Sequence, residues 1–495
     1  MDAGERHRTR PPVGLRSFRA KRPKPATSPA SSPASDTRSK SLRFPRLPEP
    51  AVHGAAAIAI YLRVMIVPAM AQSTDGSRPG DLFSFPQIGQ AAGQVLKNHG
   101  IYLDAGYLND ILANVKGGNE TGVTSAGDAF AAVNFDMNTI AGIPNAAMHI
   151  IFDDRTGKNA STLAGTQFGL SAINGPSDTI RLSEFSWGQI LFDDHLRLLV
   201  GRINPTADFA TFDLACSFVS NITCSQPFAW YVNTSGVAYP VSTWGGRVTL
   251  KPTLPSYFRV GVYQDQPIQN AVTEHGFDWG INTSTGVFIP FEAGVQTNFS
   301  STRYPFKYDV GGYYDTGRFT VPPASGITDL NRRGRTGFYV QMKQTVSRPD
   351  PSTNRSLTLF GGVLAATGGF QDYPLSVYTG AYQRGPFPSR PNDALGFEAT
   401  YVTINKKAQG QVIDTFDSLG LTAPNHANEW VFEVNYNIAI ALGVSLAPVA
   451  QYVVHPDAIG FHTPRPGVDH AFVVGAQVVI NVGEMLGLPH WIRLN

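Results

Sequence analysis

Residues 429–438 read EWVFEVNYNI, and this stretch alternates strictly between two kinds of side chain. One set is apolar and aromatic: Trp430, Phe432, Val434, Tyr436 and Ile438. The intervening set is largely polar: Glu429, Val431, Glu433, Asn435 and Asn437. Because successive side chains of a β-strand point to opposite faces, the stretch predicts a strand with one oily face and one acidic, polar face.

The same period of two recurs along the chain in both directions from this strand. The clearest further windows are Trp244–Lys251, Phe258–Gln264, Gly337–Thr345, Asp393–Ile404 and Ala471–Val482. Turn-forming clusters such as 116–119, 153–157 and 347–351 separate strand-like windows, and a single helical window, Ile88–Asn98, precedes them. Strands do not alternate with helices in this pattern, so the sequence predicts an all-β chain.

Two architectures satisfy such strands. In a soluble sandwich the apolar faces form a core, whereas in a transmembrane barrel they face lipid and the polar faces line a lumen. The 424 residues after Ala71 show no repeat and no break in composition. This length is long for one sandwich, but it suits a single antiparallel barrel of about sixteen strands of roughly ten residues each. We therefore expect the transmembrane β-barrel, with the sandwich as the alternative.

The charge balance separates the chain into two parts. Residues 1–71 hold 13 of the 39 Lys and Arg but only 4 of the 37 Asp and Glu, so the remainder carries 26 basic and 33 acidic residues, a net charge of −7. A body of this sign argues against nucleic acid as a partner, because phosphate binding needs a basic surface. The body also contains no apolar run approaching the ~18 to 20 residues of a membrane-spanning helix.

The first part of the chain is typical of an exported protein. Residues 1–50 form a basic, Pro- and Ser-rich extension that we expect to be disordered. We hypothesise that the true start codon lies downstream of Met1, so that this extension is not translated. An apolar stretch follows and closes on Ala69-Met70-Ala71, which predicts a signal peptide over 51–71 cleaved after Ala71. The expected organisation is then a periplasmic N-terminal segment at 72–99, the barrel at 100–482 and a C-terminal tail at 483–495.

The chain contains two cysteines, Cys216 and Cys224, in one expected connection between strands. In an exported chain a close pair is most simply a disulfide. A zinc site would need two more ligands of suitable spacing, and a pair of free thiols would be open to oxidation. We expect the disulfide, which would stiffen this connection.

Several stretches resemble a known family. They are 181–209, which reads RLSEFSWGQILFDDHLRLLVGRINPTADF, 100–107, 258–264 and 429–436. Together these stretches resemble the carbohydrate-selective porins of the OprB type, found in Gram-negative outer membranes. The resemblance implies one barrel of about sixteen strands, a short N-terminal periplasmic helical segment and passive diffusion of sugars without a cofactor. The implied partners are sugars, outer-membrane lipid, lipopolysaccharide and the barrel assembly machinery, and a homo-oligomer is left open.

A sugar pore needs mixed hydrogen-bond donors and acceptors on its inner wall, because pore diameter, lining groups and their field set selectivity. Alternation places a specific set of polar side chains in the lumen, and we expect the constriction to draw on them: Glu184, Arg197, Arg247, Lys251, Arg259, Tyr263, Tyr339, Gln341, Lys343, Glu429, Glu433, Asn435 and Asn437. Each could equally be a solvated wall residue. The pairs Gly201-Arg202 and Asp208-Phe209, where a strand gives way to a loop, suit loop folding as well as ligand contact.

The sequence favours a channel over an enzyme. It shows no His-Glu-x-x-His, no G-x-S-x-G and no Walker motif, and we predict no metal site. The acidic pairs Asp153-Asp154 and Asp193-Asp194 resemble neither glycosidase carboxylates nor a calcium site, because we expect both pairs at turns. The alternatives are a barrel-embedded outer-membrane enzyme and a secreted carbohydrate-binding β protein.

Overall fold

The structure is a computed structural model that describes residues 78–491, apart from 174–177, 213, 215, 225, 236–238, 254, 322–329, 425 and 460–464. The predicted basic extension, the signal peptide and its cleavage after Ala71 lie outside the described residues.

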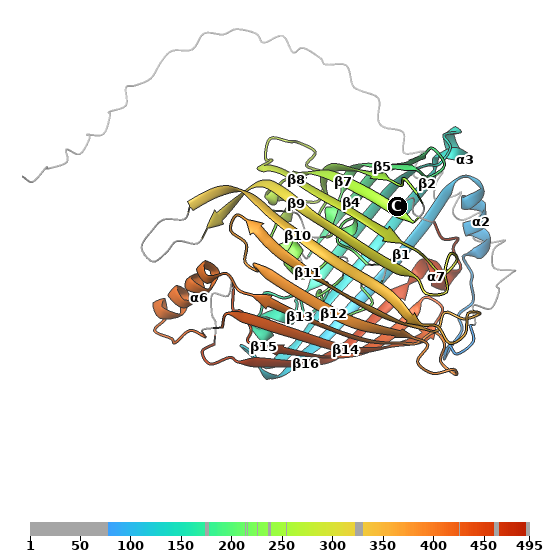
Figure 1. The fold of residues 1–495 in the computed structure, drawn as a ribbon. Coiled ribbons are helices and arrows are strands. Elements are labelled where there is room, and N and C mark those ends of the chain that lie inside the picture. Colours follow the sequence, from blue (N-terminus) through green and yellow to red (C-terminus); the bar gives the residue numbers. More distant parts are fainter. Residues whose placement is uncertain are drawn as a thin grey trace, which may run out of the picture. The chain divides into compact units, whose positions relative to one another are not determined.

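Sixteen antiparallel strands in the described residues close into a barrel, in which each strand pairs with its neighbours in the chain and β1 pairs with β16 (Figure 1). The strands are β1 (Ile101–Gly117), β2 (Gly122–Asp136), β3 (Ala146–Gly157), β4 (Thr179–Leu191), β5 (Leu196–Ile203), β6 (Thr243–Leu250), β7 (Ser256–Asp265), β8 (Gly286–Gln296), β9 (Phe306–Val321), β10 (Leu330–Ser347), β11 (Ser356–Gly368), β12 (Leu375–Arg384), β13 (Ala394–Thr403), β14 (Asn428–Ala441), β15 (Val444–Val454) and β16 (His470–Asn481). The predicted all-β barrel is confirmed.

Short helices accompany the strands: α2 (Gln90–Asn98), α3 (Met137–Ala141), α4 (Ser161–Ala164), α5 (Phe228–Val232), α6 (Lys406–Ser418) and α7 (Val482–Leu486). The predicted helical window at Ile88–Asn98 is present as α2. Among the described residues, no helix combines the length and the apolar character needed to cross a membrane.

The two faces of the barrel follow the predicted alternation. On β14, Trp430 and Val434 are 40% and 48% exposed, whereas Glu429 and Glu433 are fully buried inside the barrel. A soluble sandwich would bury its apolar faces instead. One predicted turn is wrong: residues 153–157 belong to β3, whose pairing with β2 continues to Gly157. Asp153 and Asp154 are therefore strand residues and not turn residues.

The ends of the barrel differ in the length of their connections. At one end, which we call the short-turn end, strands are joined by stretches such as 192–195, 251–255 and 442–443. The opposite, long-loop end carries 158–178, 204–242 and 404–427, the last of which contains α6 (Figure 1). Outer-membrane barrels place short turns in the periplasm and longer loops outside the cell, and by this rule we expect the short-turn end to face the periplasm.

The chain after β16 folds back at the short-turn end. After α7 it brings Trp491 to the inner face of β1 and β3, with ring centroids 4.9 Å from Tyr102 and 6.1 Å from His149. This segment covers the β1–β3 side of the periplasmic mouth. The side of this mouth formed by β5 to β9 is the side on which a cavity lies.

The connection between β5 and β6 spans residues 204–242, and its described residues turn into the barrel and supply much of its core; we call this connection the inward loop. Phe209, Phe218 and Trp230 from this loop are each at most 1% exposed. Trp230 packs edge-on against Tyr313 and Tyr339 of the wall, with ring centroids 4.8 and 5.1 Å away. Such packed aromatic rings bury large apolar areas, so the lumen is narrowed by a loop that is firmly seated.

Candidate functional site

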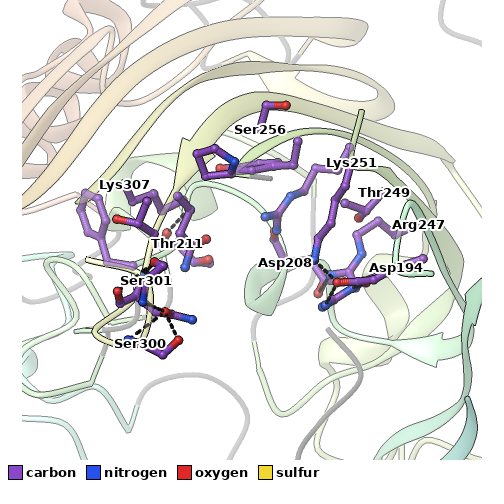
Figure 2. A pocket seen from close by; sticks show the side chains of 18 residues that line it. Asp194, Asp208, Thr211, Arg247, Thr249, Lys251, Ser256, Ser300, Ser301 and Lys307 are labelled. Carbon is purple, nitrogen blue, oxygen red and sulfur yellow. Dashed lines mark hydrogen bonds and ion pairs between the residues drawn. The ribbon is translucent and has the colours of Figure 1, made fainter. Parts of the chain in front are cut away.

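The inward loop separates two cavities inside the barrel. The first, of about 790 Å³, lies at the short-turn end between the loop and the strands β5 to β9 (Figure 2). The second, of about 360 Å³, is lined by other residues of the loop together with β1, β2, β3 and β16. Both volumes fall in the range of small-molecule sites.

Five cationic side chains border the first cavity, and we call this set the basic wall: Arg197, Arg247, Lys251, Arg259 and Lys307. Four of them are predicted pore-lining residues. Lys307 was missed, although Lys307 and Asp309 alternate on β9 with the outward Tyr308 and Val310 in the same way.

At the mouth of the first cavity, Asp194 is shared by two cations. Its carboxylate accepts hydrogen bonds from the Arg197 guanidinium at 2.8 Å and from Lys251 Nζ at 2.7 Å. The hydrogen bond from Arg197 lowers the pKa of Asp194 to about 2, since hydrogen bonding to the charged form favours it. Asp193 and Asp194 do lie in a turn, the one between β4 and β5.

Deeper in the first cavity, Asp208 of the inward loop is held by three wall residues. Arg247 forms an ion pair with its carboxylate, the Tyr263 hydroxyl donates to Oδ2 at 3.2 Å, and Arg259 donates to its backbone oxygen at 2.6 Å. Phe209 beside it is fully buried. Both residues of the Asp208-Phe209 pair therefore take part in seating the loop.

Glu292 on β8 lies behind the basic wall and is fully buried. Its carboxylate accepts from the Tyr339 hydroxyl at 2.6 Å, from the Tyr257 hydroxyl at 2.7 Å and from the backbone N–H of Ala210 at 2.8 Å. The predicted pore-lining Tyr339 is thus engaged with a wall carboxylate and sits against the inward loop.

Across the lumen, three buried carboxylates on β13 and β14 form what we call the acid wall: Glu398, Glu429 and Glu433. Glu433 accepts the backbone N–H groups of Val219 and Ser220, each at 2.7 Å. Glu398 accepts the hydroxyls of Ser220 and Thr223, each at 2.5 Å. Both carboxylates therefore hold the middle of the inward loop.

Two more predicted residues of this side bind loops in the same way. Asn435 donates to the backbone oxygen of Ser217 at 3.0 Å. Glu429 accepts the hydroxyl of Thr166, from the long connection 158–178, at 2.5 Å. The structure places these two side chains on the inner face, as the alternation predicts. There they contact residues of the loops.

The remaining predicted residues are placed on the inner face without reaching the first cavity. Glu184 accepts the Ser186 hydroxyl at 2.6 Å, and Gln341 accepts the Tyr378 hydroxyl at 2.8 Å. Lys343 is buried, and Asn437 continues the polar face of β14 in a half-buried position.

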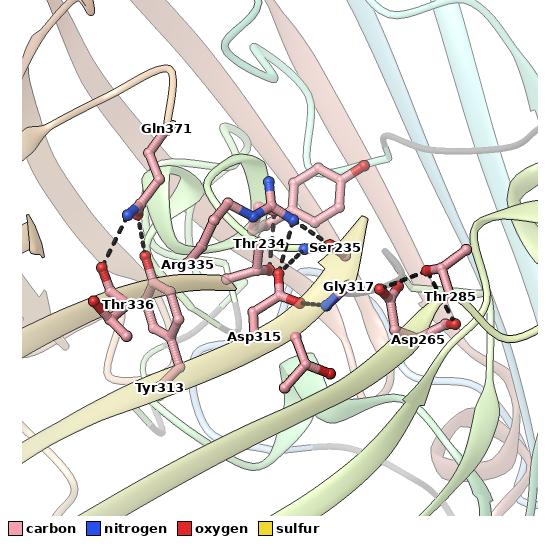
Figure 3. Close-up of polar contacts among 12 residues, drawn as sticks. Thr234, Ser235, Asp265, Thr285, Tyr313, Asp315, Gly317, Arg335, Thr336 and Gln371 are labelled. Atoms are coloured by element: carbon pink, nitrogen blue, oxygen red, sulfur yellow. Dashed lines mark hydrogen bonds and ion pairs between the residues drawn. The ribbon is translucent and has the colours of Figure 1, made fainter. Parts of the chain in front are cut away.

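Near the long-loop end, a polar network holds the far part of the inward loop (Figure 3). Asp315 on β9 accepts the Ser235 N–H at 2.6 Å and pairs with Arg335 at 2.7 Å. Asn233 and Tyr373 exchange two hydrogen bonds, Asn233 Nδ2 to the Tyr373 oxygen at 2.7 Å and the Tyr373 N–H to Asn233 Oδ1 at 3.0 Å. The loop is therefore fixed along its whole described length.

Beside Tyr373, two carboxylic acids lie in connections at the long-loop end. Burial, with the nearby charge of Asp457, raises the pKa of Asp372 to about 6. Burial also raises the pKa of Asp457, whose carboxylate accepts the Gln167 N–H at 3.0 Å.

More than half of the residues that line the second cavity come from the inward loop, and they include four aromatic residues and the disulfide that joins Cys216 and Cys224. Arg155 of β3 also lines it and pairs with Asp128 at 2.9 Å. Sequence reasoning missed Arg155, since residues 153–157 read as a turn. The described residues contain no group of three or more His, Cys, Asp or Glu side chains placed to hold a metal ion.

Arg202, the other half of the Gly201-Arg202 pair, is fully buried and donates to the backbone oxygens of Asp278 and Ser242 at 2.7 and 2.6 Å. Gly201 has a φ of +149°, and a Cβ there would lie 2.2 Å from the Phe185 oxygen. Only glycine avoids this clash. This pair therefore serves the fold at the start of the inward loop.

Comparisons with known proteins agree with this architecture. Porin B of Pseudomonas aeruginosa is 27% identical over 400 residues, covering 75% of this chain and 85% of that protein. Putative porin QuiX of Acinetobacter baylyi is 25% identical over 418 residues, covering 78% and 90%. The high-pH structure of Pseudomonas putida OprB superposes with a TM-score of 0.71 at 21% identity, covering 78% of this chain and 96% of that one, and supports the fold.

The family assignment rests on most of the barrel. Residues 120–481 match the carbohydrate-selective porin, OprB family. Family and fold together indicate a channel rather than an enzyme. The chain therefore belongs to the carbohydrate-selective porins of the OprB family, which act in the Gram-negative outer membrane as channels for the passive diffusion of sugars.

Proposed function

We propose that sugars reach the periplasm through the first cavity, along the basic wall, and that the acid wall serves to hold the inward loop. The single observation that carries this proposal is a difference between the two walls: Arg197 and Lys251 pair with a turn residue and border open space, whereas the Glu433 carboxylate accepts N–H groups of the inward loop. The channel carries out no covalent chemistry in this account.

The cavity offers the groups that a sugar needs. Beside the cations it is lined by hydroxyl and amide side chains: Thr211, Thr249, Ser256, Gln296, Thr297, Asn298, Ser300 and Ser301. Hydroxyls both donate and accept hydrogen bonds, whereas cationic groups only donate. A solute with hydroxyls on every side can exchange its water contacts for these groups, which supports passage of a polyol.

The outer surface supports the remaining partners. Phe338, Val340 and Met342 on β10 are 52%, 60% and 46% exposed and point outward. Such a band suits a lipid environment. We include lipopolysaccharide and the barrel assembly machinery among the proposed partners, because a barrel of this kind has to be inserted into an outer membrane.

Liposome swelling with the purified protein tests the proposed pathway. We expect faster swelling with glucose than with amino acids of similar size. Thr249→Trp, which places an indole on the inner face of β6 in the first cavity, should slow glucose entry strongly. Ser352→Trp is the matched control, because Ser352 is exposed in the turn after β10. Equal glucose rates for the two variants would contradict the pathway, and absence of any glucose entry in the unaltered protein would contradict the channel itself.

A further inference from the structure

The first cavity has an excess of positive charge among the side chains that border it. Five of them are cationic and two, Asp194 and Asp208, are carboxylates. Both carboxylates are engaged by those cations, Asp194 with Arg197 and Lys251 and Asp208 with Arg247. The charged part of the surface that a solute meets is therefore mainly guanidinium and ammonium, beside the neutral polar groups.

Two further carboxylates balance part of this charge from behind the wall. Lys307 Nζ lies 3.6 Å from Glu292 and 3.3 Å from Asp309, and both of these acidic side chains have no exposed surface. A solute in the cavity therefore cannot contact these two carboxylates directly, because other side chains cover them. Counted together, five cations face four carboxylates, and only two of the four border the cavity.

One of the cations retains unused hydrogen-bonding capacity. Arg247 has a side chain that is only 3% exposed, and its Nε has no hydrogen-bond partner among the described residues. A guanidinium has five N–H donors in a planar fork that matches a carboxylate. Arg197, Lys251 and Arg259 keep about one-fifth or slightly less of their side chains exposed, and from there they can donate charge-assisted hydrogen bonds to an anionic group.

Neutral polar groups face Arg247 and Lys251 across the cavity, and Lys307 lies on the same side as the neutral groups. Figure 2 shows Ser300, Ser301 and Thr211 on one side and Arg247 with Lys251 on the other. A ligand that carries one negative group at one end and several hydroxyls along its length would match both sides.

We infer that the first cavity is a subsite for sugar acids, that is, polyols carrying one carboxylate such as aldonates and uronates, which the channel passes in addition to neutral sugars. This inference rests on the proposed pathway through the first cavity. Rings of Arg and Lys select anions in pores, and a charged cleft raises the local concentration of the opposite ion. The hydroxyl groups opposite select polyol anions over simple ones.

Planar bilayers with the purified full-length protein test this inference. With a potassium gluconate gradient across the membrane, we expect a reversal potential whose sign shows that gluconate permeates more readily than potassium. The double variant Arg197→Gln/Lys251→Gln should lower the gluconate-to-potassium permeability ratio about tenfold. Both side chains lie at the cavity mouth and are about one-fifth exposed, and resistance of the barrel to SDS before boiling verifies the fold of the variant. The double variant Lys406→Gln/Lys407→Gln, at two exposed positions of α6, is the charge-matched control and should keep the original ratio.

The outcomes separate the two proposals. A reversal potential that favours potassium over gluconate, together with normal glucose swelling, overturns the sugar-acid subsite and leaves the sugar pathway standing. Equal preference for chloride and gluconate in parallel gradients also overturns it, because the wall then selects charge without recognising the polyol. Passage of neither glucose nor gluconate defeats the proposed function itself.

Discussion

The two charged walls of the lumen carry side chains that alternation places inside the barrel in the same way, yet they face different surroundings. On the basic wall, Arg197 and Lys251 border a cavity of about 790 Å³. On the acid wall, Glu398 and Glu433 are fully buried against the inward loop. An inward position on a porin strand therefore does not define a pore-lining residue; the element that lies opposite decides its role.

The largest expected effect is the loss of an acid-wall anchor. Glu433→Ala leaves the buried N–H groups of Val219 and Ser220 without an acceptor, which costs about 1–3 kcal/mol for each group. We expect a marked fall in the unfolding midpoint in detergent, measured by heat-modifiable migration, together with unsteady single-channel currents. Glu433→Gln keeps one acceptor oxygen and should lose less. Wild-type currents and stability in the alanine variant would show that the loop is held by other contacts.

The second effect is a difference in pH response between two carboxylates at opposite ends of the barrel, Asp372 at the long-loop end and Asp194 at the short-turn end. The pKa of Asp372, beside the tyrosine that holds the inward loop, is raised from 3.8 to about 6. Its contribution to stability is full below 3.8 and is lost as the pH rises through about 6. For Asp194, with a pKa lowered to about 2, the contribution is present above 3.8 and is lost only as the pH falls through about 2.

We therefore expect acidification from about pH 7.5 to about pH 5 to stabilise the protein through Asp372 and to leave the Asp194 contacts unchanged. Asp372→Asn should remove part of this gain, whereas Asp194→Asn should not alter it. Unfolding midpoints of the three proteins at both pH values provide the measurement. An identical pH dependence in the Asp372 variant and the wild type would refute the assignment.

The third effect concerns the disulfide between Cys216 and Cys224, which closes a short segment of the inward loop. Removing the cross-link with the double variant Cys216→Ser/Cys224→Ser costs about 2–3 kcal/mol in the chain-entropy account. We expect the cost to appear locally, as faster amide exchange around Val219, while the strands keep their protection. A uniform loss of protection over the barrel would mean that the bridge supports the whole fold.

The smallest effect on stability is expected on the basic wall. Lys251→Gln removes one of the two cations that share Asp194, and Arg197 retains the other contact. Partly exposed pairs contribute about 0–1 kcal/mol, so the unfolding midpoint should barely change. Glucose swelling should nevertheless slow down, because the substituted side chain borders the cavity. A large loss of stability with unchanged swelling would reverse the roles assigned to the two walls.

The fold could be predicted from the sequence because a strand can be recognised from its own alternation of polar and apolar residues. The alternation over 429–438 is a local property, and the structure reproduces it as β14 with Trp430 outside and Glu433 inside. The one wrong turn, at 153–157, arose because Asp and Gly are common in turns. On β3 the side chain of Asp153 is instead buried inside the barrel.

The functional division of the lumen could not be predicted in the same way. It depends on contacts between residues far apart in the chain, such as Val219 with Glu433 and Ala210 with Glu292. The alternation of polar and apolar residues predicts which face of a strand a residue occupies. It does not predict where a loop of some forty residues turns into the barrel. Lys307 could have been found from its alternation on β9, whereas the anchoring role of Glu433 required the path of the inward loop.

The most direct test of the central claim compares two matched threonines on the inner face. Thr249 on the basic wall borders the first cavity and is 6% exposed, and Thr400 beside Glu398 on β13 is 3% exposed. Each is replaced by cysteine, and its reaction with a negatively charged methanethiosulfonate reagent is followed by the current through a planar bilayer. We predict rapid reaction and a reduced current for Thr249→Cys, with slow reaction and little change for Thr400→Cys. Equal rates, or a faster reaction at Thr400→Cys, would contradict the account.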